Sequence, residues 1–400
     1  MPMPNMQEPT SVLVVDFPSR GPMHSGFNGA LLRIIRLAFP NATITTYAQA
    51  AHNAVLREET NDLEGLAWET RPPIYDGEKL LPAFKTNLQH LRAQLDGAKK
   101  ARHTIEQAAA DIKADLIVIV CPAPLVMGAL RFAKLPKAVP IHHIFFGQIK
   151  AARERALRNP IWKTFTLRND IRFGAMKTVR FIMLEKHLEN AFHTYMGNTR
   201  YPVFTLDHPL PTVAAAPRHE ALSKPVKCAF LGMAVPPKGF SGFVEIARKL
   251  ASEDLEFHGL GHLGNNVDHL DLTPLTTRPT GDKLPQDIFV QKLLEMDCIV
   301  QPMSAAYANN ASGTLLDAIA YEKPFFCLKN DVMDTLEDAH GPIGYAASDL
   351  DDLAQAVQDF ADGKYVDAQA VWLENQRAVK KARSLETLAA KYRDYILGGE

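Results

Sequence analysis

The sequence predicts an α/β protein with two successive domains, each built on a parallel β-sheet covered by helices. The chain has 400 residues, which is longer than one compact core usually accommodates. Short, nearly continuous apolar runs alternate with longer segments of helical periodicity, as is typical of parallel strands that are buried on both faces. This alternation stops once, in the proline-rich stretch 200–225, and then restarts, which indicates a connection between two domains.

The first half of the chain contains four apolar runs that we expect to be strands: residues 11–15, 42–47, 116–120 and 140–146. A loop with Gly21, Gly26 and Gly29 follows the first run, and helical periodicity then begins at residue 30 and continues to residue 38. Residues 83–113 also have a helical pattern, with a leucine-rich apolar stripe between many lysine, arginine and glutamine residues.

The second half repeats this order of strand and helix. We expect strands at 228–231, 255–258, 298–300 and 325–328, and helices at 240–251, 287–295, 314–321 and 350–362. The stretch 366–397 reads as one long helix of mixed charge.

These elements give a predicted domain plan. It comprises a first domain (1–205), a linker (206–225), a second domain (226–375) and a C-terminal helix (376–400) that packs back on the first domain. Ligands of open parallel sheets bind outside the carboxyl ends of the strands, so we expect a ligand cleft between the domains.

Composition excludes several functions. The net charge of −1 gives no overall attraction to nucleic acid or membrane, and no apolar run is long enough to span a bilayer. The N-terminal residues have no basic region followed by an apolar stretch, so we expect no secretory signal and a cytoplasmic location. The four cysteines lie in or beside apolar runs without a C-x-x-C pair, which favours buried, reduced thiols. We expect no metal site, because no Asp or His residues have ligand spacing.

The segment 302–324 carries the most chemistry. It follows an apolar run, contains the turn Ser312-Gly313-Thr314, continues as a helix and ends before another apolar strand. A helix N-terminus after a glycine turn suits a phosphate, and Asn310 adds a polar group there. Ser312 and Thr314 are also ordinary helix caps, and both roles are compatible. Asp317, one turn into the helix, would accept hydrogen bonds from a sugar or ribose hydroxyl.

Lys238 lies in a Pro-Pro-Lys-Gly turn after a strand. A compact ammonium group at this point suits a phosphate, and the alternative is a solvated turn lysine. Gly26, Gly259 and Gly261 complete the glycines that we expect near a bound ligand.

Histidines are the candidate bases of the first half. His24 lies in the glycine loop, where it either reaches the cleft or is simply exposed. His142 and His143 point to opposite faces of their predicted strand, so we expect one to be structural and the other, taken as His143, to face the cleft. Asp16, after the first strand, is a loop cap or a weaker candidate for a cleft carboxylate.

Residues 150–187 are strongly basic, and aromatic residues are interleaved with the charges. Such a segment is an anionic-lipid or membrane-surface contact, a solvated helix pair or an RNA-binding surface. We favour the lipid contact, with these residues on the surface: Arg153, Arg155, Arg158, Trp162 and Lys163.

Four segments in the second half resemble one family in their order and spacing. Phe230-Leu231-Gly232 with Lys238-Gly239 resembles the "strand–Gly-Arg…Lys-Gly" segment of GT-B glycosyltransferases, and residues 257–261 resemble their strand that ends in G-x-G. Residues 297–302 and 309–324 resemble the following strand and the donor-binding motif that ends in "E-A-x-A-x-G-x-P". The resemblance covers residues 225–330 well and the first half by pattern only.

This resemblance implies two Rossmann-like domains, with a nucleotide sugar held by the second domain and an acceptor held by the first. It implies that Lys238 pairs with the donor diphosphate, that Ser312, Gly313 and Thr314 contact phosphate or sugar, and that Asp317 lies where the family has a ribose-binding glutamate. It also implies that no metal or other cofactor is needed.

The chain departs from the family pattern at four positions. Met233 stands at the position of a phosphate-binding arginine, Asn309 and Asp317 stand at the positions of two glutamates, and Glu322 replaces a glycine. Charge near the donor sugar is therefore reduced, which leaves the identity of the sugar and the stereochemical class open.

We therefore expect a metal-independent hexosyltransferase of surface polysaccharide biosynthesis, peripheral to the inner face of a membrane. It would use a UDP-, GDP- or dTDP-sugar and a glycan or lipid-diphosphate-linked acceptor. The alternatives are a nucleotide-sugar epimerase of the same fold and a degenerate glycosyltransferase that acts as a scaffold. Donor base, donor sugar, acceptor, inversion or retention, and oligomeric state are left open by the sequence.

Overall fold

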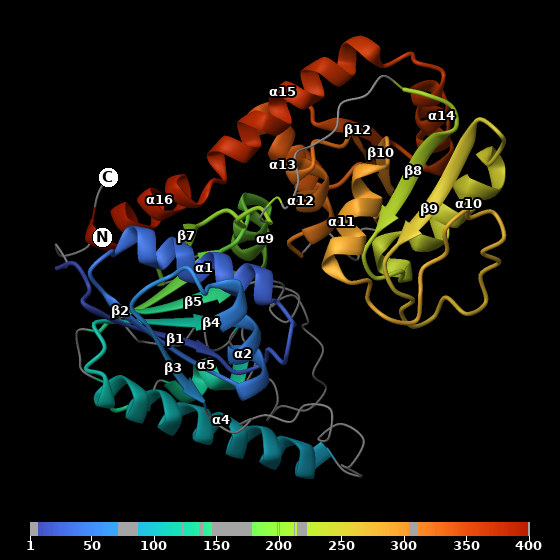
Figure 1. The fold of residues 1–400 in the computed structure, drawn as a ribbon. Coiled ribbons are helices and arrows are strands. Elements are labelled where there is room, and N and C mark those ends of the chain that lie inside the picture. Colours follow the sequence, from blue (N-terminus) through green and yellow to red (C-terminus); the bar gives the residue numbers. More distant parts are fainter. Residues whose placement is uncertain are drawn as a thin grey trace. The chain divides into compact units, whose positions relative to one another are not determined.

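The computed structural model describes residues 7–70, 87–121, 124–130, 132–135, 139–145, 178–197, 199, 201–211, 213, 222–303 and 310–398. The chain divides into two compact units. The first unit comprises residues 1–209 and 385–400, and the second comprises residues 210–384 (Figure 1).

The first unit is built on a parallel sheet in the order β3-β2-β1-β4-β5-β6-β7. Its strands are β1 (Ser11–Asp16), β2 (Thr43–Ala48), β3 (Leu66–Thr70), β4 (Leu116–Val120), β5 (Ile141–Phe145), β6 (Val179–Met183) and β7 (Val203–Thr205). Strand β1 lies inside the sheet, where Val14 pairs with Thr46 of β2 and with Val118 of β4. Strands β4 and β5 are buried along their whole length, as expected for parallel strands that are covered on both faces.

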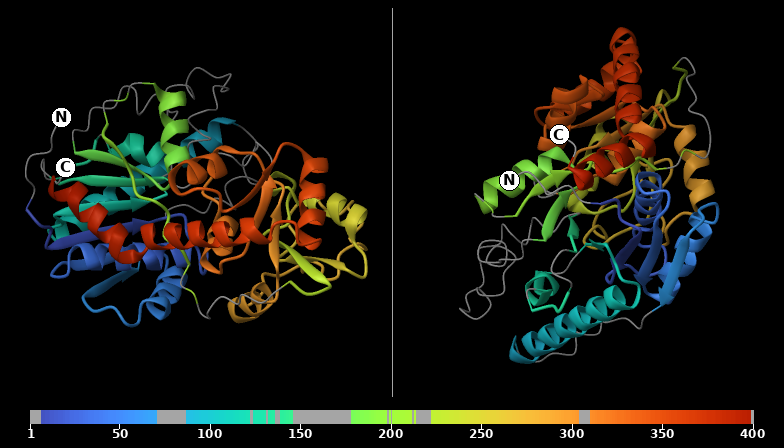
Figure 2. Two further views of the ribbon diagram at one scale, coloured as in Figure 1. Left: turned by 90° about the horizontal axis from the view of Figure 1, so that it is seen from above. Right: turned by 90° about the vertical axis from the view of Figure 1, so that its left-hand side faces the viewer.

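The helices of this unit are α1 (Ser25–Ala38), α2 (Ala50–Glu59), α4 (Asn87–Asp111), α5 (Pro124–Leu130), α9 (Lys186–Met196) and α16 (Leu385–Leu397). The last of these returns from the far end of the chain and packs against α1 (Figures 1 and 2). The prediction that a C-terminal helix packs back on the first domain is therefore confirmed.

The second unit is built on a parallel sheet in the order β12-β11-β10-β8-β9. Its strands are β8 (Val226–Leu231), β9 (Leu255–Leu260), β10 (Cys298–Gln301), β11 (Phe325–Leu328) and β12 (Gly344–Ala347). Its helices are the 3-10 turn η1 (Pro236–Lys238), α10 (Phe240–Leu250), α11 (Gln286–Leu294), α12 (Gly313–Ala320), α13 (Asp331–His340), α14 (Leu350–Ala361) and α15 (Val366–Ala382). Buried side chains lie on both faces of the sheet, in two apolar clusters.

The predicted fold class of two Rossmann-like α/β domains is confirmed. Strands β3, β6, β7 and β12 were not predicted from the sequence, and the predicted elements differ from the structure in the following details. Gly26 and Gly29 lie within α1, which begins at Ser25 and not at residue 30. The stretch 366–397 forms two helices that separate at Arg383 and Ser384. The division between units falls after Pro209 and after Ser384, so α15 belongs to the second unit and α16 alone belongs to the first.

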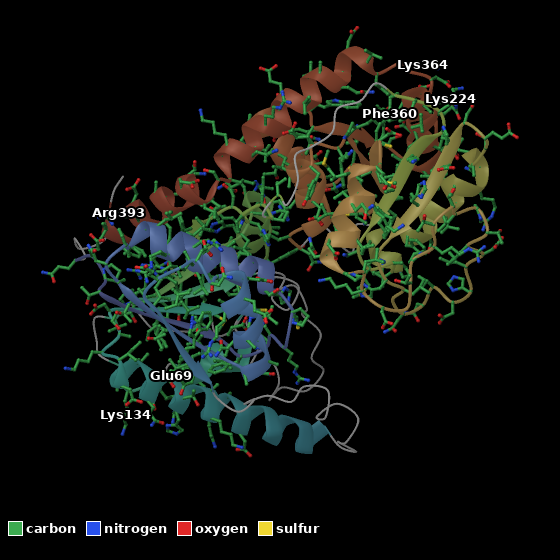
Figure 3. The ribbon with its side chains drawn as sticks, in the orientation of Figure 1. Glu69, Lys134, Lys224, Phe360, Lys364 and Arg393 are labelled. Atoms are coloured by element: carbon green, nitrogen blue, oxygen red, sulfur yellow. The ribbon has the colours of Figure 1, made fainter. Side chains whose placement is uncertain are left out.

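Polar contacts fix α16 on the first unit. Tyr392 and His142 of β5 are both buried, and the Tyr392 hydroxyl lies 2.9 Å from His142 Nδ1. Arg393 (Figure 3) donates two hydrogen bonds to the Glu8 carboxylate at 2.8–2.9 Å and a third to the carbonyl of Ala38 at 2.6 Å. The C-terminal segment is therefore an integral part of the first unit.

Two further predictions concern the membrane and the cysteines. In the described part of the chain, no helix is both long and apolar enough to cross a membrane. All four cysteines are free, and Cys228, Cys298 and Cys327 are buried as expected, whereas Cys121 is partly exposed.

The hydroxyl of Tyr392 offers a clean test of this docking. Tyr392→Phe should lower the free energy of unfolding of the first unit by about 1–2 kcal/mol, because it leaves the buried His142 nitrogen without its partner. Tyr395→Phe is the matched control, since the Tyr395 hydroxyl is buried without a hydrogen-bond partner and its ring stacks on Phe204 at 4.1 Å. Urea unfolding followed by circular dichroism measures both, and equal losses would contradict the assignment.

Candidate functional site

Glycines allow the backbones at the carboxyl ends of β8, β9 and β10 to meet in the second unit. A Cβ atom on Gly261, directly after β9, would lie 1.9 Å from the carbonyl oxygen of Gly232, directly after β8. A Cβ atom on Gly239 would lie 1.8 Å from the carbonyl oxygen of Pro302, after β10. Gly239 also has a φ of 86°, which disfavours other residues. The three strand ends therefore form one tightly packed edge.

Lys238 ends η1 at this edge, and a buried glutamine holds the turn in place. Gln301 has no exposed surface, its Oε1 accepts a hydrogen bond from the Leu231 N–H, and its Nε2 donates to the carbonyl of Lys238, both at 3.3 Å. Sequence reasoning missed this role of Gln301. The available signal was a single polar residue between an apolar strand and Pro302.

The Lys238 ammonium group lies close to the start of α12. A Cβ atom on Gly232 would be 3.3 Å from Lys238 Nζ and 3.2 Å from Thr314 Cγ2. The structure thus brings together Lys238 and Thr314, which the sequence placed in separate motifs.

The N-terminus of α12 is capped and open at the same time. Ser312 is the N-cap, and its Oγ accepts a hydrogen bond from the Leu315 N–H at 3.4 Å and lies 3.2 Å from the Thr314 hydroxyl. Gly313 is exposed, and among the residues that the structure describes nothing lies within 4 Å of the position of a Cβ atom there. Asn310 lies two residues before the cap. The helix therefore presents its positive end to free space, where an anion is stabilised.

Asp317 and Lys238 are both forced toward their neutral forms. Burial raises the pKa of Asp317 from 3.8 to about 7, and the nearby charges of Lys238 and Lys283 oppose this rise. Burial lowers the pKa of Lys238, and the charge of Asp317 opposes that change. For both groups, the effect of desolvation on the pKa is thus larger than the effect of the neighbouring opposite charge. An additional anion at this point would favour the charged ammonium group of Lys238.

The remaining glycine predictions divide into structural and open positions. Gly259 lies inside β9, where a Cβ atom would be 2.6 Å from Pro279 Cδ, so its small size serves packing. Gly261 likewise serves contact with the backbone of Gly232. Gly26 is exposed in the first turn of α1, and a Cβ atom there would meet nothing within 4 Å.

A buried polar network shapes the loop after β1 in the first unit. Asp16 accepts hydrogen bonds from the Ser19 N–H at 3.0 Å and from Asn28 Nδ2 at 2.5 Å. Asn28 Nδ2 also lies 2.8 Å from His52 Nε2, and His52 Nδ1 lies 2.7 Å from the carbonyl of Gly21. Asp16 therefore acts as a loop cap, and no sequence pattern indicated its connection to His52 on α2.

His24 is the N-cap residue of α1 and feels the charge of Asp16 from this network. His24 is exposed and adopts a left-handed conformation with φ 57°, which is uncommon outside glycine. Desolvation of the imidazole lowers the pKa of His24, partly offset by the charge of Asp16. The ring is therefore neutral at pH 7, the form that accepts a proton.

His142 and His143 are both buried, with 1 % of each residue exposed. Burial lowers the pKa of each to about 3. The His143 ring lies 6.0 Å from the ring of Phe181, within the apolar core. This position does not fit the expectation that His143 faces a cleft. Successive side chains of β5 point to opposite faces of the sheet, and both faces are buried at this strand.

Other predicted residues lie outside the described part of the chain. These are Asn309 and the five residues of the predicted lipid-contact surface: Arg153, Arg155, Arg158, Trp162 and Lys163. Among the residues that the structure describes, no group of three or more His, Cys, Asp or Glu is arranged to hold a metal ion.

Comparison with solved structures identifies the fold as that of GT-B glycosyltransferases. WaaG, a glycosyltransferase involved in lipopolysaccharide biosynthesis, aligns with a TM-score of 0.61 and 14% identity over 97% of this chain and 100% of WaaG. HepE from Anabaena, solved with UDP and glucose, aligns with a TM-score of 0.64 and 13% identity over 97% and 99%. TarM aligns with a TM-score of 0.63 and 9% identity over 98% and 99%. No protein-family model and no curated protein matches the sequence.

The raised pKa of Asp317 predicts a pH-dependent effect of Asp317→Asn on stability. Because the folded-state pKa lies above the unfolded value, the contribution of Asp317 to stability falls as pH rises from about 4 to about 7 and then levels off. The variant does not ionise, so it should gain about 1–2 kcal/mol over wild type by pH 8 and nothing at pH 4. Asp287→Asn, an exposed position on α11, is the charge-removal control.

Thermal unfolding at pH 4, 6 and 8 measures this difference. A gain that is the same at all three values would mean that Asp317 is not a desolvated carboxyl.

Proposed function

We propose that this protein is a glycosyltransferase that moves a sugar from a nucleotide donor to a hydroxyl group of a glycan or glycolipid acceptor. One observation carries the proposal: the Lys238 ammonium group lies at the open N-terminus of α12, beside Gly232 and Thr314. A cation and a helix dipole that converge on free space suit a diphosphate.

The chemistry follows from this arrangement. As the bond between sugar and phosphate breaks, negative charge develops on the leaving nucleoside diphosphate. Lys238 and the N–H groups at the start of α12 stabilise that charge without rearrangement, because Gln301 and Ser312 already hold both elements in place. The diphosphate in turn favours the protonated form of Lys238. Asp317, one turn further along α12, is available to the donor's ribose or sugar hydroxyls.

The fold comparison supports a nucleotide-sugar donor. The HepE structure contains UDP and glucose, WaaG is described as acting in lipopolysaccharide biosynthesis, and a TarM variant was solved with UDP and a glycerol-linked sugar. By analogy we propose a UDP-, GDP- or dTDP-hexose donor, no metal ion, and an acceptor from surface polysaccharide biosynthesis. A cytoplasmic protein that contacts the inner membrane face through residues 150–187 fits a lipid-linked acceptor.

His24 is the proposed proton acceptor if the reaction inverts the sugar configuration. It is exposed and neutral at pH 7, and the charge of Asp16 acts on its ring. A reaction with retention needs no such base.

Lys238→Ala tests the donor site directly. We expect binding of the preferred nucleoside diphosphate to weaken by about 1.5–3 kcal/mol, which is roughly 10–150-fold, because a charge-assisted contact is lost. Isothermal titration calorimetry with UDP, GDP and dTDP measures the change. Lys249→Ala is the matched control, since Lys249 lies on the neighbouring helix α10 and pairs with Asp351 at the surface. Unchanged affinity of Lys238→Ala would remove this residue from the site.

Gly313→Ala separates binding from folding. Open space surrounds the position of the new methyl group, so the melting temperature should not fall. The same methyl group occupies the space in which a phosphate would approach the helix N-terminus, so affinity for the diphosphate should drop at least about 10-fold, or 1.4 kcal/mol. Normal affinity in the folded variant would place the ligand elsewhere.

A further inference from the structure

We propose that Lys283 is a second cation of the diphosphate site and supplies the positive charge that Met233 lacks. This inference rests on the proposed function, because it assigns a further residue to the same ligand.

Backbone hydrogen bonds bring the segment before Lys283 to the carboxyl edge of the second sheet. The Thr280 N–H donates to the carbonyl of Gly261 at 3.1 Å, and the Leu263 N–H donates to the carbonyl of Thr280 at 2.7 Å. The Thr280 hydroxyl then donates to the carbonyl of Asp282 at 2.6 Å. Since Gly261 packs on Gly232, the segment that ends in Lys283 lies beside the strand end that Lys238 also approaches. In Figure 1 this connection between β9 and α11 runs along one edge of the unit.

The electrostatic environment of Asp317 places the Lys283 charge near α12. The positive charges of Lys238 and Lys283 both favour the ionised form of Asp317, so both lower its pKa. Coulomb interactions weaken with distance and are screened by water, so a lysine that acts on a partly buried carboxyl lies close to it. The charge of Lys283 therefore acts on α12 together with that of Lys238, which agrees with the hydrogen-bonded position of residues 280–282 at this edge of the sheet.

The site needs this second charge to hold a diphosphate. Met233 is 41 % exposed and carries no charge at the position where the resemblance places an arginine. To the extent that Asp317 ionises, its charge offsets that of Lys238, and the partial charge of the helix end is only about +0.5. Lys283 makes the sum clearly positive. It is exposed, so its charge costs little desolvation, and its flexible stem lets the ammonium group close on a bound phosphate.

The test compares nucleoside diphosphates with nucleosides. Wild type, Lys283→Ala and Lys238→Ala are titrated with UDP, GDP and dTDP, and with uridine, guanosine and thymidine, in 50 mM and 300 mM salt. We expect Lys283→Ala to weaken the preferred diphosphate about 5–20-fold at low salt, less at high salt, and to leave the nucleoside unchanged. Lys292→Ala on α11 is the matched control. The charge of Lys292 lowers the pKa of His258, whereas the charges that lower the pKa of Asp317 are those of Lys238 and Lys283.

Two results would overturn the inference and leave the proposed function standing. One is a loss of diphosphate binding in Lys238→Ala with no loss in Lys283→Ala. The other is an equal loss for diphosphate and nucleoside in Lys283→Ala, which would mean that Lys283 only orients Asp317. Failure of the wild-type protein to bind any of the three diphosphates would overturn both the inference and the proposed function.

Discussion

The contact between glycine backbones at the carboxyl edge of the second sheet is the constraint on which the candidate site depends. Gly261 meets the carbonyl of Gly232, and Gly239 meets the carbonyl of Pro302, at separations that no Cβ atom tolerates. Because these contacts bring three strand ends together, the turn that carries Lys238 and the start of α12 converge. A looser edge would separate the cation from the helix dipole, and the two would no longer act on one phosphate group.

Most of the architecture was predictable, because parallel strands that are buried on both faces appear in the sequence as continuous apolar runs. The run at 116–120 is β4, and that at 325–328 is β11, residue for residue. Strand β7 and helix α9 have no comparable signal, since β7 is short and half-buried and α9 follows basic sequence. The start of α1 was misplaced because Gly26 and Gly29 are typical loop residues, whereas Gly29 lies against Glu59 of α2 within the helix and Gly26 is in its exposed first turn.

The residues of the candidate site also divide into those that the sequence predicted and those that it did not. Local motifs pointed to Lys238 and to the Ser312–Thr314 cap, because a turn and a helix start are specified by neighbouring residues. Gln301, Asn28 and His52 were not found, since their roles depend on partners far away in the sequence. His143 shows the converse error: alternation assigns a side chain to a face of the sheet, but says nothing of what covers that face.

The candidate site carries few fixed charges. Met233 is uncharged, and Asp317 is a carboxyl whose pKa is raised by burial, so it resists ionisation. Fixed charges inside a partly buried site must be paired or they destabilise the empty protein, and a shifted pKa is one way to avoid this cost. Burial raises the pKa of Asp317 to about 7 and lowers the pKa of Lys238, so both shifts lessen the cost of charge in the empty site. An anion bound beside Lys238 would act against the effect of burial, because it favours the charged ammonium group.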